Sequence, residues 1–158
     1  MRAELGDLVI RPARAEDLGG IEHLLIDRRL PPAGISEHLA DSLVAEKGTE
    51  LLGCAGIERY GDVGLLRSVA VLESASGRGL GVRLVEAAIT RASRVGIRTL
   101  YLLTTTAAGY FPRFGFEVIP RTELPAVLNA SEELQGACPA SATAMRRPLE
   151  LRGPDLTP

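Results

Sequence analysis

Three glycines at alternate positions join an apolar run to an amphipathic helical pattern near the middle of the chain. The segment reads Ser76-Gly77-Arg78-Gly79-Leu80-Gly81, and residues 65–71 before it are almost entirely apolar, as in a central strand covered on both faces. After it, apolar residues recur at helical spacing along residues 80–95. Alternate glycines let the backbone approach a ligand closely, and a helix N-terminus adds a partial positive charge. The unit therefore predicts a phosphate cradle between a buried strand and a helix.

An isolated glycine triplet also fits a tight strand–helix turn that binds nothing. Two common phosphate loops are excluded by single residues. A dinucleotide-binding fingerprint would need glycine where Val82 stands, and a Walker loop needs a lysine, whereas the only lysine in the chain is Lys47. What remains is an x-G-R-G-x-G loop.

The rest of the chain predicts a mixed α/β domain built around one sheet. Helical spacing is present in residues 18–25, 36–39, 80–95 and 107–113. Strands are predicted at residues 8–12, 42–46, 51–60, 65–71, 97–103, 116–119 and 142–147. Residues 1–150 are expected to form a single domain, and residues 151–158, with two prolines, a flexible tail.

Composition narrows the class of partner. The chain has 158 residues, enough for one core but not for two ordinary domains. Its net charge of -2 argues against a nucleic-acid or anionic-membrane partner, and no apolar run approaches the length of a membrane span. Cys54 and Cys138 are interpreted as free thiols in a reducing compartment, which predicts a cytoplasmic location.

The glycine loop resembles the acyl-CoA pyrophosphate loop of the GNAT superfamily of N-acetyltransferases. The resemblance extends over roughly residues 8–145 and includes Ile10-Arg11-Pro12-Ala13, Arg67-Ser68-Val69-Ala70-Val71, and Tyr110 through Phe116, in the family's order. It implies a GNAT-like mixed sheet with splayed central strands flanked by helices. It also implies acetyl-CoA as co-substrate, and no metal.

In that family the central strand lends main-chain groups to the pantetheine arm, a role that the resemblance carries onto Val69, Ala70 and Val71. The pyrophosphate would lie on the glycine loop and the first turn of its helix, at Ser76, Gly77, Arg78, Gly79, Leu80, Gly81 and Val82. The family usually has glutamine or arginine where Ser76 stands, and Arg78 is a candidate to replace that contact.

The acceptor is indicated by the branch that the chain is most similar to. Residues 102–107 resemble bacterial glutamate N-acetyltransferases. Residues 65–68 and 138–142 are similar to acetyltransferases found with arsenic-resistance genes. These similarities imply a small-molecule amine partner, namely the amino group of an amino acid or a glutamate analogue such as phosphinothricin or arsinothricin. A homodimer is a further expectation.

The catalytic base is not at the family's usual position. Transfer to an amine needs a neutral nitrogen, and a carboxylate is a suitable base. Many relatives have a glutamate at the start of the central strand, where this chain has Leu65, and Glu58 is the predicted replacement. The turn at residues 61–64 is expected to place Glu58 opposite Arg67, on one sheet face.

Arg67 is unusual in an apolar strand. Strand alternation predicts that it shares its face with Val69 and Val71. It is predicted to bind a substrate carboxylate with its two-pronged guanidinium, and the alternative is a plain cross-strand ion pair with Glu58.

The predicted acid is Tyr110. The family's tyrosine position holds Phe111 here, and Tyr110 lies one residue earlier, about 100° round a helix, so a core position for Tyr110 is the alternative. Thr104 and Thr105 are predicted to contact substrate. One hydroxyl among these and Thr106 could help the thiolate leave, although β-propensity and capping explain them equally well.

Two other functions stay open. Loss of the usual base and acid at Leu65 and Phe111 would fit a degenerate acyl-CoA-binding sensor. A protein N-terminal or lysine acetyltransferase would need an acidic peptide groove, which sequence does not reveal.

Overall fold

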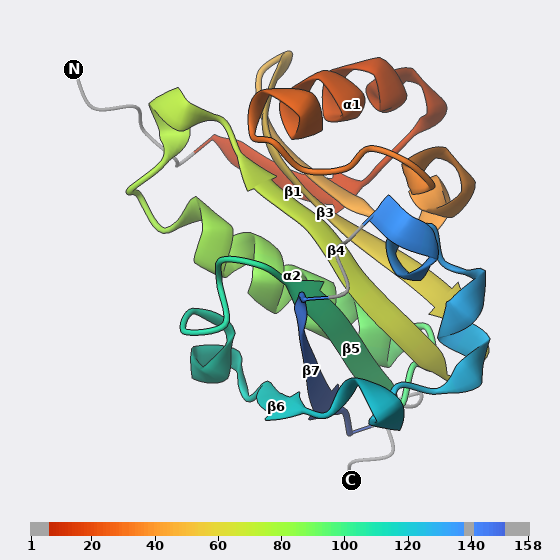
Figure 1. Ribbon diagram of the computed structural model, residues 1–158. Coiled ribbons are helices and arrows are strands. Elements are labelled where there is room, and N and C mark those ends of the chain that lie inside the picture. Colours follow the sequence, from red (N-terminus) through yellow and green to blue (C-terminus); the bar gives the residue numbers. More distant parts are fainter. Residues whose placement is uncertain (1–6, 138–140, 151–158) are drawn as a thin grey trace, which may run out of the picture.

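The computed structural model describes residues 7–137 and 141–150 and contains one seven-stranded mixed sheet (Figure 1). The strand order is β1-β2-β3-β4-β5-β7-β6, and every neighbouring pair is antiparallel except β4–β5. The strands are β1 Leu8–Pro12, β2 Leu43–Lys47, β3 Glu50–Tyr60, β4 Val63–Val71, β5 Thr99–Thr104, β6 Glu117–Ile119 and β7 Thr143–Pro148. The predicted mixed α/β class is confirmed. The predicted tail, residues 151–158, lies outside the described residues.

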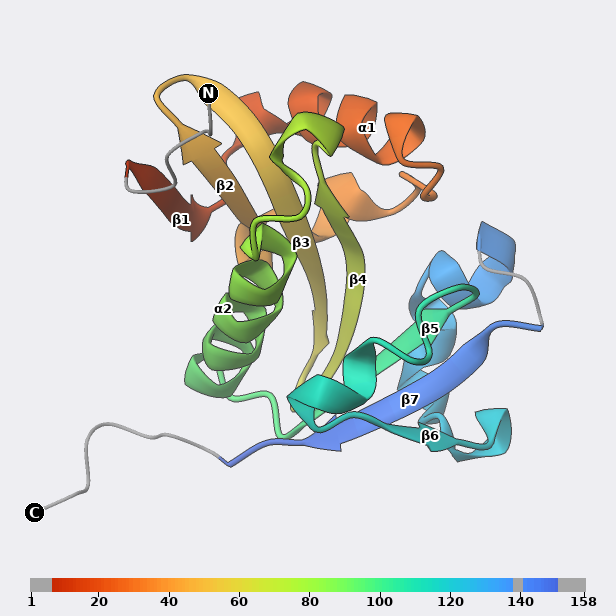
Figure 2. The same ribbon diagram turned by 90° about the vertical axis from the view of Figure 1, so that its left-hand side faces the viewer.

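Two α-helices, α1 (Leu18–Asp27) and α2 (Leu80–Arg94), cover opposite faces of the sheet (Figure 2). The helix predicted at residues 107–113 is wrong in extent, because only a 3-10 turn at Phe111–Phe114 forms, with Pro112 at its start. Other 3-10 helices are Ala15–Asp17, Ile35–Asp41, Glu73–Ala75, Arg121–Glu123 and Ala126–Ala130, and Glu133–Ala137 is a π-helical turn. In the part of the chain that the structure describes, no helix combines the length and apolar character needed to cross a bilayer.

Helix α2 fixes the glycine loop in place. Its apolar stripe, which includes Leu80, Leu84 and Val85, is buried in the main core with Leu52 and Ile57 of β3. Each fully buried side chain of this size contributes about 1.5–3 kcal/mol. The first turn of α2 is therefore held firmly at the end of β4, where the loop emerges.

The β3–β4 hairpin has a tighter turn than expected. Tyr60 pairs with Val63, so the loop contains only Gly61 and Asp62, and Gly61 has a φ of 65°. Glu58 consequently pairs with Leu65 rather than with Arg67, which corrects the predicted register by two residues. A shift of two residues preserves the sheet face, and Glu58 still meets Arg67 as a diagonal neighbour.

Strands β4 and β5 part after a short parallel contact. Their pairing ends at Leu65 and Tyr101, so the β5-facing edge of β4 beyond Leu65 has no strand partner among the described residues. The two strands diverge visibly in Figure 2. The expected splay of central strands is therefore present.

A bulge lies in the parted section of β4. The register with β3 shifts between Cys54 and Gly56, so β4 carries one extra residue near Ser68, whose φ is 58°. An extra residue reverses strand alternation. Val69 packs in the α2-side core, whereas Arg67 reaches Pro31 in the segment after α1. The prediction that Arg67 shares a face with Val69 and Val71 is therefore wrong.

Candidate active site

The glycine loop is open toward solvent at two backbone positions. Gly77 and Gly79 have φ values of 78° and 80°, and a Cβ built on either would meet no heavy atom within 4 Å. Gly79 is the N-cap of α2, so the first amides of a fifteen-residue helix face this space. Such a cradle of free amides suits an anion. Ser76 takes no part through its side chain, because its Oγ donates to the Glu73 carbonyl oxygen at 2.7 Å.

Arg78 has a guanidinium nitrogen, Nη1, that is buried and has no hydrogen-bond partner among the described residues. A buried, unpaired cationic donor is unfavourable unless a ligand completes it. Its place in the loop between Gly77 and Gly79 fits a phosphate group. The donor set of the loop therefore matches the pyrophosphate for which the sequence predicts it.

A pocket of about 200 Å³ occupies the gap between β4 and β5. Residues 66–69 form its β4 wall, and Leu30 covers it from the segment after α1. The remaining lining residues are Leu102, Leu103, Thr104, Thr106, Ala107, Tyr110 and Phe111. The pocket is mostly apolar with a few polar groups, as small-molecule sites commonly are.

Tyr110 connects this pocket to the glycine loop. It lines the pocket, and its hydroxyl oxygen lies 3.3 Å from the position that a Cβ on Gly81 would take. Burial raises the pKa of the Tyr110 hydroxyl, so the group stays protonated at neutral pH. Phe111, at the family's usual tyrosine position, is instead buried in the main core.

The three predicted threonines, residues 104–106, differ in where they lie relative to the pocket. Thr104 and Thr106 line the pocket, but Thr105 is exposed and is not part of the wall. The Thr104 Oγ1 accepts the backbone N–H of Ala107 at 2.9 Å, which is the capping alternative. The substrate contact predicted for Thr105 therefore lacks support from this geometry.

Glu58 and Arg67 form a buried ion pair, with Arg67 Nη1 2.8 Å from Glu58 Oε2 and no exposed side-chain surface on either. The second carboxylate oxygen of Glu58 accepts the Tyr60 hydroxyl at 2.5 Å. Glu58 is absent from the pocket wall, whereas Arg67 belongs to it. Among the sequence-predicted pair, only Arg67 thus borders the pocket directly.

The polar cluster around this pair is larger than the sequence indicated. Arg67 also donates from Nε to Ser68 Oγ at 2.9 Å and from Nη2 to the Pro31 carbonyl oxygen at 2.8 Å. The Glu133 carboxylate lies 3.7 Å from Arg67 Nε, and His38 Nε2 lies 3.4 Å from the Tyr60 hydroxyl. No sequence signal pointed to Pro31, Glu133 or His38, since these contacts join segments far apart along the chain.

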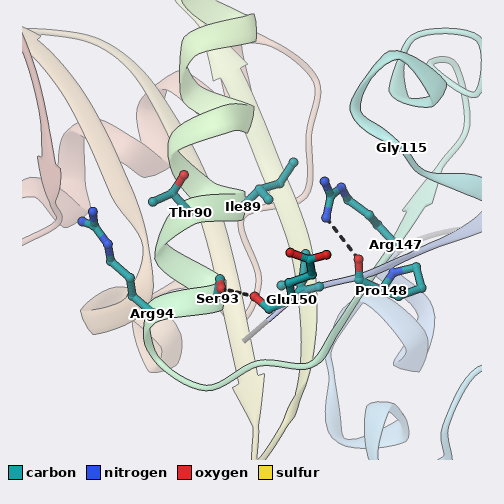
Figure 3. A pocket seen from close by; sticks show the side chains of 9 residues that line it. Ile89, Thr90, Ser93, Arg94, Gly115, Arg147, Pro148 and Glu150 are labelled. Atoms are coloured by element: carbon teal, nitrogen blue, oxygen red, sulfur yellow. Dashed lines mark hydrogen bonds between the residues drawn. The ribbon is translucent and has the colours of Figure 1, made fainter. Parts of the chain in front are cut away.

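A roomier pocket, about 650 Å³, lies at the other end of α2, away from the glycine loop. Figure 3 shows Ser93 of α2 facing Glu150 just past the end of β7, whereas the Arg94 side chain extends away from it. Two of its polar side chains already donate to backbone oxygens of the same pocket: Ser93 Oγ donates to the Glu150 carbonyl oxygen, and Arg147 donates to the Pro148 carbonyl oxygen (Figure 3). The smaller pocket, in the gap between β4 and β5, contains Arg67, Ser68 and Tyr110 and lies beside the glycine loop. The candidate site is therefore placed there. Within residues 7–137 and 141–150, no group of three or more His, Cys, Asp or Glu side chains could hold a metal ion.

The reactivity of the Cys54 thiol reports whether the core beside the β4 bulge is closed to solvent. Burial raises the pKa of its thiol from 9.0 to about 12, and its Sγ donates to the Ser68 carbonyl oxygen at 3.3 Å. Because the thiolate is the reactive form, we expect Cys54 to resist a thiol reagent at pH 8 until the protein unfolds. A raised folded-state pKa also means that this thiol adds stability below pH 9, which is lost as the pH rises toward about 12.

The measurement uses a disulfide reagent on a Cys138→Ser protein, so that Cys54 is the only thiol counted. Cys138 itself lies outside the described residues. Stoichiometric labelling of the folded protein within minutes would contradict the closed core.

Comparison with known proteins gives consistent matches. Residues 38–118 match the family model described as an acetyltransferase (GNAT) domain. An uncharacterized N-acetyltransferase of Chlorobaculum tepidum is 31% identical over 129 residues, which cover 75% of this chain and 81% of that protein. An amino-acid acetyltransferase of Neisseria meningitidis is 30% identical over 127 residues, 73% of this chain and 29% of that enzyme.

Among solved structures, N-acetylglutamate synthase from Neisseria gonorrhoeae, complexed with coenzyme A and N-acetyl-glutamate, superimposes with a TM-score of 0.78 at 25% identity. The match covers 94% of this chain and 36% of that chain. This chain thus spans only about a third of the length of the two neisserial enzymes.

Proposed function

The chain belongs to the GNAT family of acetyltransferases, and we propose that it transfers an acetyl group from acetyl-CoA to the amino group of a small amino acid or amino-acid analogue. The observation that carries the proposal is the continuity of the open glycine cradle with the pocket at the β4–β5 gap, through Tyr110. The amino-acid acceptor is supported by the N-acetyl-glutamate bound to the gonococcal neighbour.

The residues of the cradle fit the phosphates of the donor. The amides of residues 77–82 and the unpaired Nη1 of Arg78 would hold the pyrophosphate. The free main-chain edge of β4 at Val69, Ala70 and Val71 would hold the pantetheine arm, as the sequence resemblance implies. When bound, acetyl-CoA supplies an acyl group activated as a thioester.

Two side chains are proposed to handle protons. Tyr110 stays protonated near neutral pH, faces the pocket and lies beside the cradle, so it is suited to protonate the leaving sulfur. Glu58 remains the predicted base. Its carboxylate has no exposed surface, so an amine proton would reach it through water or through Tyr60.

Two roles are proposed for Arg67, and a single experiment separates them. Its hydrogen bonds support a role in holding Glu58, Ser68 and Pro31 in place. Its position in the pocket wall supports binding of an acceptor carboxylate. Glutamate, phosphinothricin and arsinothricin all carry an acidic group for such a contact.

The proposed function is tested by thiol release from acetyl-CoA with a panel of free amino acids, each paired with its side-chain or α-carboxyl amide. We expect turnover with at least one glutamate-like acceptor and a higher kcat/KM for the acid than for the amide. An Arg67→Met protein should lose that preference if Arg67 binds the carboxylate. Equal losses on acid and amide would assign Arg67 to support alone.

A sensor function is the second candidate, because Leu65 and Phe111, at the family's two usual catalytic positions, are both buried in the apolar cores. Binding of acetyl-CoA without turnover on any amine, including peptide N-termini, would favour it.

Four further expectations stay predictions: an association with arsenic resistance, a homodimer, a cytoplasmic location, and a single domain over residues 1–150.

A further inference from the structure

Ser68 adopts a backbone conformation that residues with a side chain seldom take. Its φ is 58°, it stands at the bulge of β4, and it is 8% exposed. Backbone strain of this kind persists only where surrounding contacts hold it, and it is concentrated at functional sites. Ser68 also lines the pocket at the β4–β5 gap. The strained residue therefore lies on the wall where an acyl group would enter.

The Ser68 hydroxyl is held from one side by a buried cation. Its Oγ accepts a hydrogen bond from Arg67 Nε at 2.9 Å. Within residues 7–137 and 141–150, the Ser68 hydroxyl hydrogen has no protein acceptor. A hydroxyl that accepts from a guanidinium becomes a stronger donor, because hydrogen bonds in a chain polarise one another. Ser68 thus presents a polarised donor that its own neighbours do not use.

The neighbouring hydroxyls are arranged differently. Thr104, on the β5 wall, is tied to the turn that follows it through the Ala107 amide. The Tyr110 hydroxyl lies toward the glycine loop, beside Gly81. Ser68 is the hydroxyl-bearing residue of the β4 wall, at the point where the strands have already parted, and it precedes the main-chain edge of Val69 to Val71.

We propose that the Ser68 hydroxyl donates a hydrogen bond to the carbonyl oxygen of the acyl group during transfer, with Arg67 as its positioning residue. This inference rests on the proposed function. In the transfer, the amine nitrogen forms a bond to the acyl carbon while the carbon–sulfur bond breaks and its electron pair leaves on sulfur. The amine loses one proton and the thiolate gains one, and Ser68 keeps its own. Its hydrogen bond stabilises the negative charge that builds up on the carbonyl oxygen.

The test compares acetyl-CoA with CoA, which lacks the acyl carbonyl, by calorimetric binding to wild type, Ser68→Ala and Ser68→Gly. A lost hydrogen bond to the carbonyl should weaken acetyl-CoA binding about threefold to tenfold relative to CoA binding. A purely structural defect would change both affinities together, so their ratio would not move. Ser68→Ala retains the strained backbone with a Cβ, whereas Ser68→Gly relieves the strain, and both remove the hydroxyl.

We expect the affinity ratio to fall equally in both variants, although Ser68→Gly should unfold at a higher urea concentration than Ser68→Ala. On an accepted amine, kcat should fall about 10²–10³-fold with the acceptor KM nearly unchanged. An unchanged ratio in both variants, or a change in Ser68→Gly alone, would overturn the inference. Wild-type protein that binds neither CoA nor acetyl-CoA would overturn the proposed function itself, and this inference with it.

Discussion

A Gly79→Glu protein should remain folded but bind acetyl-CoA on the order of 100-fold more weakly than wild type, about 2.7 kcal/mol. Gly79 is the N-cap of α2, and a Cβ there points into open space, where the proposed pyrophosphate would lie. A glutamate would occupy that space and place a negative charge next to the phosphates. Its own carboxylate would also satisfy the helix amides that the anion needs.

The control separates ligand exclusion from backbone strain. Gly96, just past the other end of α2, also has a positive φ, 93°, and open space around its Cβ position. Gly96→Glu should therefore lose a similar amount of stability, roughly 1–2 kcal/mol for the left-handed conformation, while binding acetyl-CoA normally. Calorimetric titration of both folded variants decides the matter, and normal affinity in Gly79→Glu would remove the cradle from the binding site.

The glycine loop was predictable because all its determinants are local. Glycine spacing, the preceding apolar strand and the amphipathic pattern of α2 are each readable within a short window, and helix α2 begins at Leu80 as expected. The strand positions were predictable for the same reason. The separation of β4 from β5 was predicted from the family resemblance and not from the periodicity of the sequence.

The geometry of the β3–β4 face was not predictable in detail. The residues 61–64 were expected to form the turn, but a two-residue loop at Gly61 and Asp62 suffices. That error shifted the register by two residues, so each side chain stayed on its predicted face of the sheet. The bulge at Ser68 adds a single residue and therefore moved Val69 to the face opposite Arg67. Nothing in the sequence Leu66-Arg67-Ser68-Val69 signals a left-handed serine.

The residues around Arg67 could not be predicted from local sequence patterns either. Pro31, His38 and Glu133 reach the cluster from three separate segments, and only the assembled fold brings them together. The sequence showed that a buried arginine needs a partner and named Glu58, which is indeed its ion-pair partner. It could not show that Arg67 would line the pocket while Glu58 would not.

Removing either member of the Glu58–Arg67 pair should destabilise the protein by about 3–5 kcal/mol, because the other charge would be left buried without its counter-ion. Neither side chain has exposed surface, so bulk solvent does not solvate the charge that is left behind. The measurement is urea unfolding of Glu58→Leu and Arg67→Met. Arg59→Met is the control, since Arg59 pairs with Asp41 while 43% of its side chain is exposed, and it should lose less than about 1 kcal/mol.

The double variant Glu58→Leu/Arg67→Met should recover a large part of the single losses, because it leaves no unpaired charge. Recovery should be incomplete, since the Pro31 carbonyl oxygen and Ser68 Oγ also lose their donor. Losses that simply add in the double variant would mean that the two side chains contribute independently.

Glu58→Gln then separates a base from an ion-pair partner. The amide has nearly the same shape: its oxygen can still accept the hydrogen bond from Arg67, and its NH2 group can donate to the Tyr60 hydroxyl oxygen, but it cannot take up a proton. If Glu58 receives the proton of the amine, turnover should fall about 10²–10⁴-fold while acetyl-CoA binding is retained. The comparison is made from pH 6 to pH 9, because a substrate amine that is already neutral at high pH needs less help. Near-normal kcat across that range, together with reduced stability, would leave Glu58 as the counter-ion that holds Arg67 in the pocket wall.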